Sequence, residues 1–116
     1  MKSHSESYII LKLRQSIYVT GITIEYIEPY LIANQIQSAP KTFALELSKN
    51  NYKYDKYKNC SDFTYNPMVD GGKKLFDCPK GTNEAYQYAK FIVLENYGAS
   101  YTCLYRIQIH GKVPIN

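Results

Sequence analysis

The chain has 116 residues, of which 45% are hydrophobic and 21% are charged, and its formal net charge is +4. This length favours one domain over two, and the composition is that of a chain that builds a core rather than a disordered tail. The charge is modest, and Lys residues between Lys49 and Lys74 stand among Asn and Tyr. That pattern fits a solvated surface better than the dense basic face of a nucleic-acid-binding protein.

Neither catalysis nor membrane insertion finds much support in the sequence. The two histidines, His4 and His110, stand near opposite ends of the chain. No apolar run approaches the roughly 20 residues of a membrane span, and the first eight residues lack the apolar stretch of a signal peptide. We therefore expect the chain as given to be soluble, with any targeting signal or anchor on a longer precursor.

Apolar side chains alternate with a period of two through most of the chain, which predicts half-buried β-strands. In chain order, the predicted strands cover residues 9–13, 22–26, 42–47, 63–65, 74–76, 90–95 and 101–110. The dense apolar run 90–95 (KFIVLE) fits a central strand that is covered on both faces. The alternation is clearest in 101–110, where Tyr101, Cys103 and Tyr105 share one side.

Turn-forming residues separate these strands. They are Gly21, Pro29, Pro40, Pro67, 70–72 (DGG), 79–83 and 96–98. Helix is nearly absent, because the stretch 84–90 is too short to be stable alone. About seven short strands, without an internal repeat or linker, predict a single all-β domain over residues 1–116, an antiparallel β-sandwich or jelly roll.

The 13 tyrosines are the outlying number in the composition. Tyr suits half-buried strands and the walls of peptide or sugar grooves, because its ring is apolar and its hydroxyl needs a partner. The alternative is codon bias, since Tyr, Lys, Asn and Ile are all abundant, as in an AT-rich genome.

Two of the three cysteines flank a symmetric segment. Residues 63–65 and 74–76 surround a loop centred near Asp70, and an antiparallel hairpin about that centre places Cys60 opposite Cys78. A non-hydrogen-bonded pair has a Cα separation of about 4.5 Å, which permits a disulfide worth about 3 kcal/mol. The alternative is two reduced, half-buried thiols, because the bond needs an oxidising compartment.

A weak hint of such a compartment is the sequence Asn59-Cys60-Ser61, which fits the N-glycosylation pattern, although a bonded Cys60 would hinder that modification. The third cysteine, Cys103, has no histidine nearby in sequence. It is most simply a small core residue of a strand.

The carboxy-terminal run 95–111 (ENYGASYTCLYRIQIHG) resembles the closing strand of the SUN domain, in which an Asn-aromatic-Gly turn leads into Tyr-Thr-Cys-aliphatic-Tyr-Arg and ends in His-Gly. Three weaker matches follow the family's order: 22–27 (ITIEYI), 38–43 (SAPKTF) and 62–66 (DFTYN). The resemblance covers nearly the whole chain from Tyr8 onward.

The resemblance implies a compact β-sandwich of the galactose-binding kind, without enzymatic activity or cofactor. SUN domains stand in the lumen of the nuclear envelope, usually as homotrimers on an upstream coiled coil. There they bind the extreme carboxy-terminal peptide of KASH proteins of the outer nuclear membrane, in the LINC complex that connects nucleus and cytoskeleton.

The family's motif also implies site residues. The positions that match its pocket for the peptide's terminal carboxylate are Ser38, Tyr101 and Tyr105, whose hydroxyls can donate to a carboxylate. Tyr26 stands where the family has a pocket His. Cys103 matches a cysteine that supports a cation-binding loop. Without the resemblance, the tyrosines would be interpreted as aromatics at the edge of the core.

The sequence also departs from the family pattern. The family's preceding helical segment, its KASH-lid hairpin and its cation loop with the partner of Cys103 are missing from this chain, so a monovalent cation and membrane attachment are expected only through upstream segments. We expect weak peptide binding and a chain that is monomeric by itself. A fragment of a SUN protein, a reduced relative and a similar sandwich with another function all fit, in that order.

Two other functions compete. A carbohydrate-binding module of the jelly-roll type would use tyrosine rings to stack on sugars, but the chain has no Trp, and the Ser38-Ala39-Pro40 match is not required by a sugar site. Nucleic-acid binding through 52–58 (YKYDKYK) would need those tyrosines on one sheet face, whereas they fall in a predicted loop. We therefore expect no nucleic-acid partner.

Overall fold

The structure is a computed structural model that describes residues 7–26, 36–50, 57–78 and 84–115. His4, the predicted turns at Pro29 and 79–83, and residues 52–56 of the tyrosine-lysine stretch lie outside the described residues. The elements in chain order are β1 (Ser7–Glu25), β2 (Pro40–Ser48), β3 (Lys58–Thr64), α2 (Pro67–Asp70), β4 (Lys73–Asp77), β5 (Tyr86–Asn96) and β6 (Arg106–Lys112).

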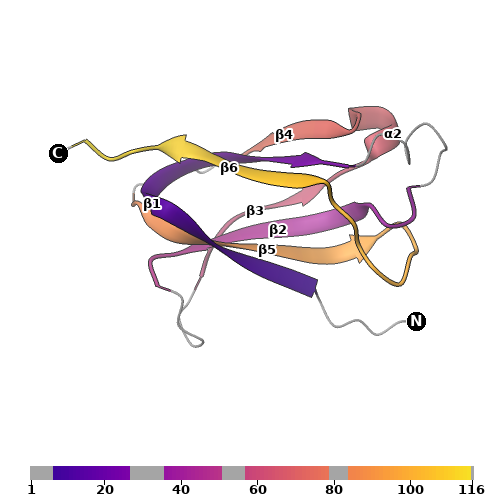
Figure 1. The fold of residues 1–116 in the computed structure, drawn as a ribbon, viewed down its shortest axis with the longest axis horizontal. Helices are drawn as coiled ribbons and strands as arrows, with labels where there is room; N and C mark the ends of the chain where they lie inside the picture. Colours follow the sequence, from indigo (N-terminus) through magenta and orange to yellow (C-terminus); the bar gives the residue numbers. More distant parts are fainter. Residues whose placement is uncertain (1–6, 27–35, 51–56, 79–83, 116) are drawn as a thin grey trace.

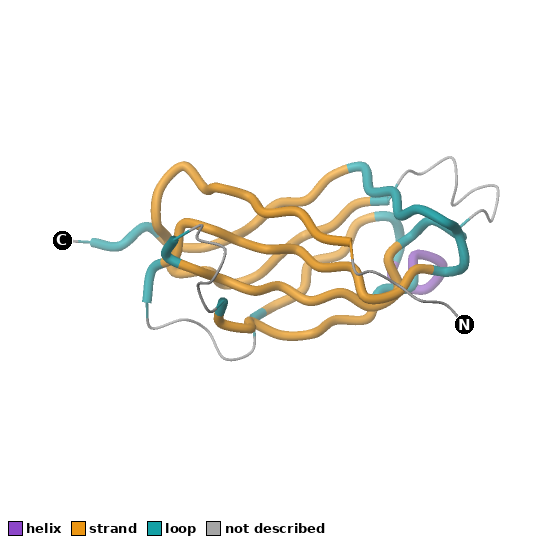
Figure 2. Tube along the Cα trace, turned by 90° about the horizontal axis from the view of Figure 1, so that it is seen from below, coloured by secondary structure: helices purple, strands orange, loops and turns teal. Residues whose placement is uncertain are grey.

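The strands form two antiparallel layers that share β1. In the first layer the order is β3-β2-β5-β1, and in the second β1 lies between β4 and β6. Figure 1 shows β4, β6 and the later part of β1 above β3, β2 and β5, and Figure 2 shows the strands running lengthwise with loops at both ends. The predicted all-β antiparallel sandwich is therefore confirmed.

Strand β1 changes layers along its length. Its first residues pair with β5, where Ser7 faces Val93, and its last residues pair with β4 and β6 at the same time. The predicted strands 9–13 and 22–26 are thus one strand, and the predicted turn at Gly21 is wrong. A Cβ at Gly21 would lie 2.6 Å from the carbonyl oxygen of Phe76, so this glycine allows close approach of β4 rather than a turn.

The core lies between the layers and is centred on Phe43. As predicted, Phe43, Leu45 and Leu47 of β2 are buried on one face. The ring centroid of Phe43 lies 5.2 Å from Phe63 and 5.0 Å from Phe91, and Phe43 also contacts Phe76 of the opposite layer. Rings from both layers therefore pack against one another, as aromatic pairs prefer.

The other elements are close to expectation. Strand β5 lies between β2 and β1, and its adjacent residues Phe91 and Ile92 are both buried, which confirms the predicted central strand. The helix α2 is a single turn in which the side chain of Asn66 accepts a hydrogen bond of 3.0 Å from the Met68 backbone N–H. Helix is thus as scarce among the described residues as the sequence predicts.

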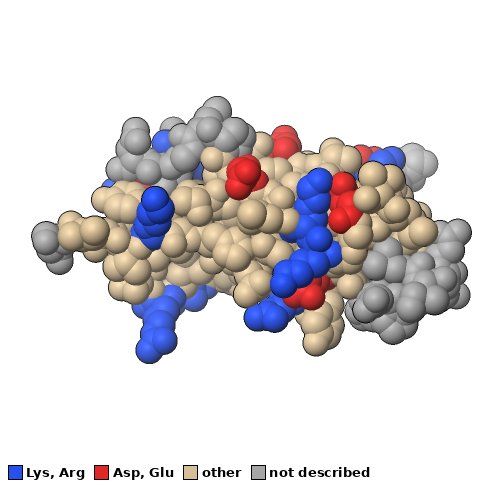
Figure 3. Space-filling view, turned by 90° about the horizontal axis from the view of Figure 1, so that it is seen from above, with Lys and Arg blue, Asp and Glu red and all other residues tan. Residues whose placement is uncertain are grey.

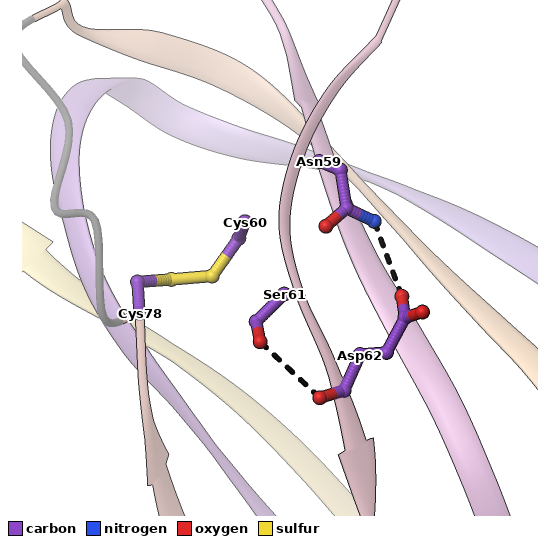
Figure 4. Close-up of a disulfide and its surroundings, with 5 residues drawn as sticks. All are labelled: Asn59, Cys60, Ser61, Asp62 and Cys78. Atoms are coloured by element: carbon purple, nitrogen blue, oxygen red, sulfur yellow. Dashed lines mark hydrogen bonds between the residues drawn. A yellow bond between two sulfur atoms is a disulfide. The ribbon is translucent and has the colours of Figure 1, made fainter.

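The predicted hairpin between Cys60 and Cys78 is wrong, although the disulfide is present. Strand β3 pairs with β2 and β4 pairs with β1, so α2 leads from one layer to the other. Cys60 and Cys78 form a disulfide with a Cα separation of 5.4 Å, which joins the two layers (Figure 4). The symmetric pattern misled because both strands bury their apolar faces in the same core, which requires no pairing between them.

Candidate peptide-binding site

The site begins with a turn that precedes β2. The backbone N–H of Ala39 donates to the carbonyl oxygen of Ile36 at 2.9 Å, which closes the turn around Ser38. The hydroxyls of Ser38 and Tyr26 share a hydrogen bond of 2.7 Å, and the two residues are only 6% and 3% exposed. The structure thus brings two predicted site residues together, but it places them inside the domain.

The segment between β5 and β6 crosses this turn. The backbone N–H groups of Ala99 and Cys103 donate to the carbonyl oxygens of Gln37 and Ser38, at 3.0 and 2.7 Å. The N–H of Tyr105 then donates to the carbonyl of Glu25 at 2.8 Å. Three backbone bonds therefore hold the predicted closing motif beside Ser38, at the end of the sandwich near α2 (Figure 1).

The predicted final strand needs a correction. Strand β6 begins at Arg106, so Tyr101, Cys103 and Tyr105 precede it in irregular backbone and do not share a strand face. The reason is that the N–H groups of Cys103 and Tyr105 bond to the Ser38 turn and to the end of β1 rather than to a strand ladder. Tyr101 is 61% exposed and Tyr105 is 68% exposed, unlike buried Ser38.

The side chain of Asn96 organises this irregular segment. Its Nδ2 donates to the carbonyl oxygens of Ala99 and Tyr101, each at 2.9 Å, and to Thr102 Oγ1 at 3.2 Å. Its Oδ1 accepts from the backbone N–H of Gly98 at 2.9 Å, and Gly98 has a φ of 116°, which favours glycine. The side-chain amide of one residue therefore forms the hydrogen bonds that hold this irregular turn.

The aromatic residue of the same turn fixes it to the core. The hydroxyl of Tyr97 donates to the carbonyl of Tyr65 at 2.5 Å, and the hydroxyl of Tyr65 donates to the carbonyl of Gly71 at 2.6 Å. Burial raises the pKa of Tyr97 and raises that of Tyr65 to about 12. Both phenols thus stay protonated donors at neutral pH.

Two adjacent hollows lie beside the closing segment. The larger, of about 460 Å³, lies between β1, β5 and the start of β6; its apolar lining residues are Ile9, Leu11, Phe91, Val93, Leu104 and Ile107. Tyr105 and Arg106 line it too, whereas Tyr101 lines the second hollow, of about 380 Å³. Both hollows include Ser7, Val93 and Thr102, and neither includes Ser38 or Tyr26.

Arg106 is a candidate binding residue that the sequence analysis missed. Arg106 lines the apolar hollow, and its guanidinium lies 3.9 Å from a carboxylate oxygen of Glu25, a long separation for an ion pair. Its Nη1 therefore makes only a loose contact with that carboxylate. The signal was available, because the motif places this arginine directly after Tyr105.

Cys103 and His110 are two further reactive side chains among the described residues. Cys103 is a free, half-buried thiol. His110 of β6 shares a hydrogen bond of 2.6 Å with Thr23 of β1. Among the residues that the structure describes, no three His, Cys, Asp or Glu side chains are grouped as metal ligands, and no helix has the length and apolar character to cross a membrane. The cation-loop role of Cys103 stays a prediction.

Charge on the visible face of the second layer is mixed. Figure 3 shows Lys and Arg beside Asp and Glu over this face, rather than a continuous basic stripe. A surface of this kind is typical of a solvated face.

The fold and the site define an all-β domain with a mainly apolar hollow that Tyr105 and Arg106 also line. Residues 2–113 match the Sad1 / UNC-like C-terminal family, and the chain belongs to that family. The predicted resemblance to the SUN domain is therefore confirmed.

Two of the three relatives compared below carry the SUN domain in their names. The chain is 32% identical to human SUN domain-containing protein 1, over 93% of this chain and 14% of that protein. It is 32% identical to mouse SUN domain-containing protein 3, over 92% of this chain and 33% of that protein. It is also 32% identical to the Caenorhabditis elegans nuclear migration and anchoring protein unc-84, over 94% of this chain and 10% of that protein. The chain thus spans a third or less of these relatives.

Proposed function

We propose that this chain is an interaction domain of the nuclear envelope that binds the carboxy-terminal tail of a KASH-type protein in the perinuclear lumen, within a LINC complex. Membership of the Sad1 / UNC-like family and the similarity to a nuclear migration and anchoring protein support this function. The structural observation that carries it is the seating of the closing segment beside an apolar hollow by three backbone hydrogen bonds, two to the Ser38 turn and one to the end of β1.

The chemistry of a chain end fits this place. A terminal carboxylate needs N–H or O–H donors. Tyr105 carries a hydroxyl and Arg106 a guanidinium, and both residues line the hollow. The apolar residues below them can cover the last side chains of a peptide. The direct contact predicted for Ser38 and Tyr26 stays a prediction, and in this structure their hydroxyls bond to each other.

The disulfide supports the compartment. Bonds such as Cys60–Cys78 persist in oxidising compartments and are rare in the cytosol. In the proposed assembly the domain acts by binding, without an enzymatic step. In this proposal the intact protein is a homotrimer.

Calorimetric titration tests the carboxylate site. A short Pro-rich peptide with a free carboxy terminus should bind about tenfold or more tightly than the same peptide amidated, since hydrogen bonds to charged groups contribute about 1.5–3 kcal/mol. Tyr105→Phe and Arg106→Gln should each reduce this difference. Tyr18→Phe is the matched control, because Tyr18 is an exposed tyrosine of β1 that lines neither hollow. Equal affinity for the two peptides would refute the carboxylate site.

The exposure of the Tyr101 and Tyr105 rings keeps the predicted carbohydrate-binding function as the second candidate. Sugars stack on exposed aromatic faces, so a glycan array would show binding that is lost in both Tyr101→Ala and Tyr105→Ala. Sugar binding without preference for a free peptide carboxylate would favour this candidate over the first.

A further inference from the structure

The motif Asn59-Cys60-Ser61 plays no part in the proposed function. It has the Asn-X-Ser spacing of an N-glycosylation acceptor, and X is not proline. It lies on β3, which is the outer strand of the first layer and pairs with β2. The side chain of Asn59 is exposed, and its Nδ2 donates to Asp62 Oδ1 at 3.3 Å in a contact open to solvent (Figure 4).

A β-bulge lies within this motif, between Ser61 and exposed Asn59. Leu45 of β2 pairs with Ser61 and the next residue, Glu46, pairs with Asn59, so Cys60 is the extra residue. A bulge changes the direction of side chains. Cys60 is buried and bonded to Cys78, whereas Asn59 is exposed. A glycan on Asn59 would therefore displace no core side chain and leave the disulfide intact.

We propose that Asn59 is an N-glycosylation site, an inference that rests on the lumenal location in the proposed function. The donor is an oligosaccharide joined through its first sugar to a lipid pyrophosphate. Asn59 Nδ2 forms a bond to C1 of that sugar while the bond from C1 to the pyrophosphate oxygen breaks. The lipid pyrophosphate leaves with the bonding electrons, the amide loses one proton, and nothing is oxidised or reduced.

The disulfide sets the order of the two modifications. A transferase must take the motif as a flexible segment, whereas the closed bond between Cys60 and Cys78 and the pairing of β3 with β2 hold it in a sheet. Transfer to Asn59 is therefore possible only before the disulfide closes, so the two modifications compete. Once attached, the glycan shields an outer strand, whose open edge could otherwise pair with another chain.

The test uses the full-length protein that contains this chain, expressed in eukaryotic cells and recovered with intact membranes. After N-glycosidase treatment, peptide mass spectrometry should show Asn59 converted to Asp, and the conversion should be lost in Ser61→Ala. Asn50→Gln is the matched control, because Asn50 is an exposed asparagine without the motif. Cys78→Ser keeps the motif and removes its competing bond, so glycan occupancy should rise. This result does not depend on whether the variant folds, because transfer precedes folding.

Protease protection in the same membranes separates this inference from the proposed function. Unmodified Asn59 in a protease-protected domain that prefers the free peptide carboxylate would overturn the glycosylation site alone. Modified Asn59 in a domain that binds free and amidated peptides equally would overturn the peptide function alone. A domain that is open to protease on the cytosolic side would overturn both.

Discussion

The interior around Phe43 and the closing turn around Asn96 are held by different forces. Four phenylalanine rings from both layers meet in the interior, where apolar burial is the main stabilising term. In the closing turn, hydrogen bonds from one amide side chain and three backbone N–H groups shape a segment with two exposed tyrosines. The comparison indicates that stability is concentrated in the core, whereas the proposed binding site lies at the turn, so substitutions should separate the two properties.

The largest effect on stability is expected in the core. Phe43→Ala removes the central ring of the aromatic cluster and should lower the free energy of unfolding by about 3–5 kcal/mol. Chemical denaturation measures this change, and Phe43→Leu should cost less because it leaves a smaller cavity. Equal, small costs for the two variants would show that the ring cluster does not dominate stability.

Loss of the disulfide should have the next largest effect on stability. Cys60 and Cys78 enclose a segment with a sequence separation of 18, and loss of such a cross-link typically costs about 3 kcal/mol. The double variant Cys60→Ala, Cys78→Ala should unfold at lower denaturant concentration with its peptide site retained. Cys103→Ala is the control thiol. Wild-type protein that unfolds at the same midpoint with and without reductant would contradict this expectation.

Replacing Asn96, whose side chain holds the closing turn, should affect peptide affinity more than stability. Asn96→Ala deletes hydrogen bonds to Ala99, Tyr101 and Gly98 and should cost about 1–2 kcal/mol of stability. The cost is limited because the backbone groups that lose these hydrogen bonds can bond to water instead. Peptide affinity should fall further, as the positions of Tyr105 and Arg106 loosen. Denaturation and titration of the same sample give both numbers, with Asn50→Ala as control. A variant with unchanged affinity would show that the turn does not position the site.

The smallest effect concerns acid stability at Asp70, the last residue of α2. The hydrogen bond from the Asn66 backbone N–H, and then that from Lys74, lower the pKa of Asp70 below its ordinary value of 3.8. The folded state therefore binds the proton less readily, so this stability is present above that value and is lost as the pH falls through the folded pKa. Asp70→Asn should cost less than about 1 kcal/mol at neutral pH and reduce the loss of stability that occurs as the pH falls below 3.8. Identical midpoints of acid unfolding for the wild-type protein and Asp70→Asn would refute this prediction.

The sequence predicted what depends on periodic burial. Phe43, Leu45 and Leu47 share a buried face as their spacing requires, and the central position of β5 follows from its dense apolar run. Pairing partners were harder to predict, because β3 and β4 bury apolar faces in one core without pairing with each other. Alternation alone cannot distinguish these cases.

The closing segment shows why the site was only partly predictable. Its alternation predicted a strand through Tyr101 and Tyr105, but long-range backbone bonds to Gln37, Ser38 and Glu25 hold it in irregular backbone. Such bonds leave no trace in local periodicity. The motif match identified the segment correctly, and coordinates were needed to show that Ser38 is buried with Tyr26 while the two tyrosines are exposed.

Under the proposed function, strand β1 has a mechanical consequence. It is antiparallel to β6 in the second layer and to β5 in the first. Tension applied by a partner near Arg106 would be transmitted along β6 and would shear several inter-strand bonds at once, because ladder bonds in antiparallel pairs stand perpendicular to the strands. Because β1 pairs with β6 in the second layer and with β5 in the first, its backbone would pass the force from one layer to the other. Resistance to pulling would then come from both layers rather than from one loop.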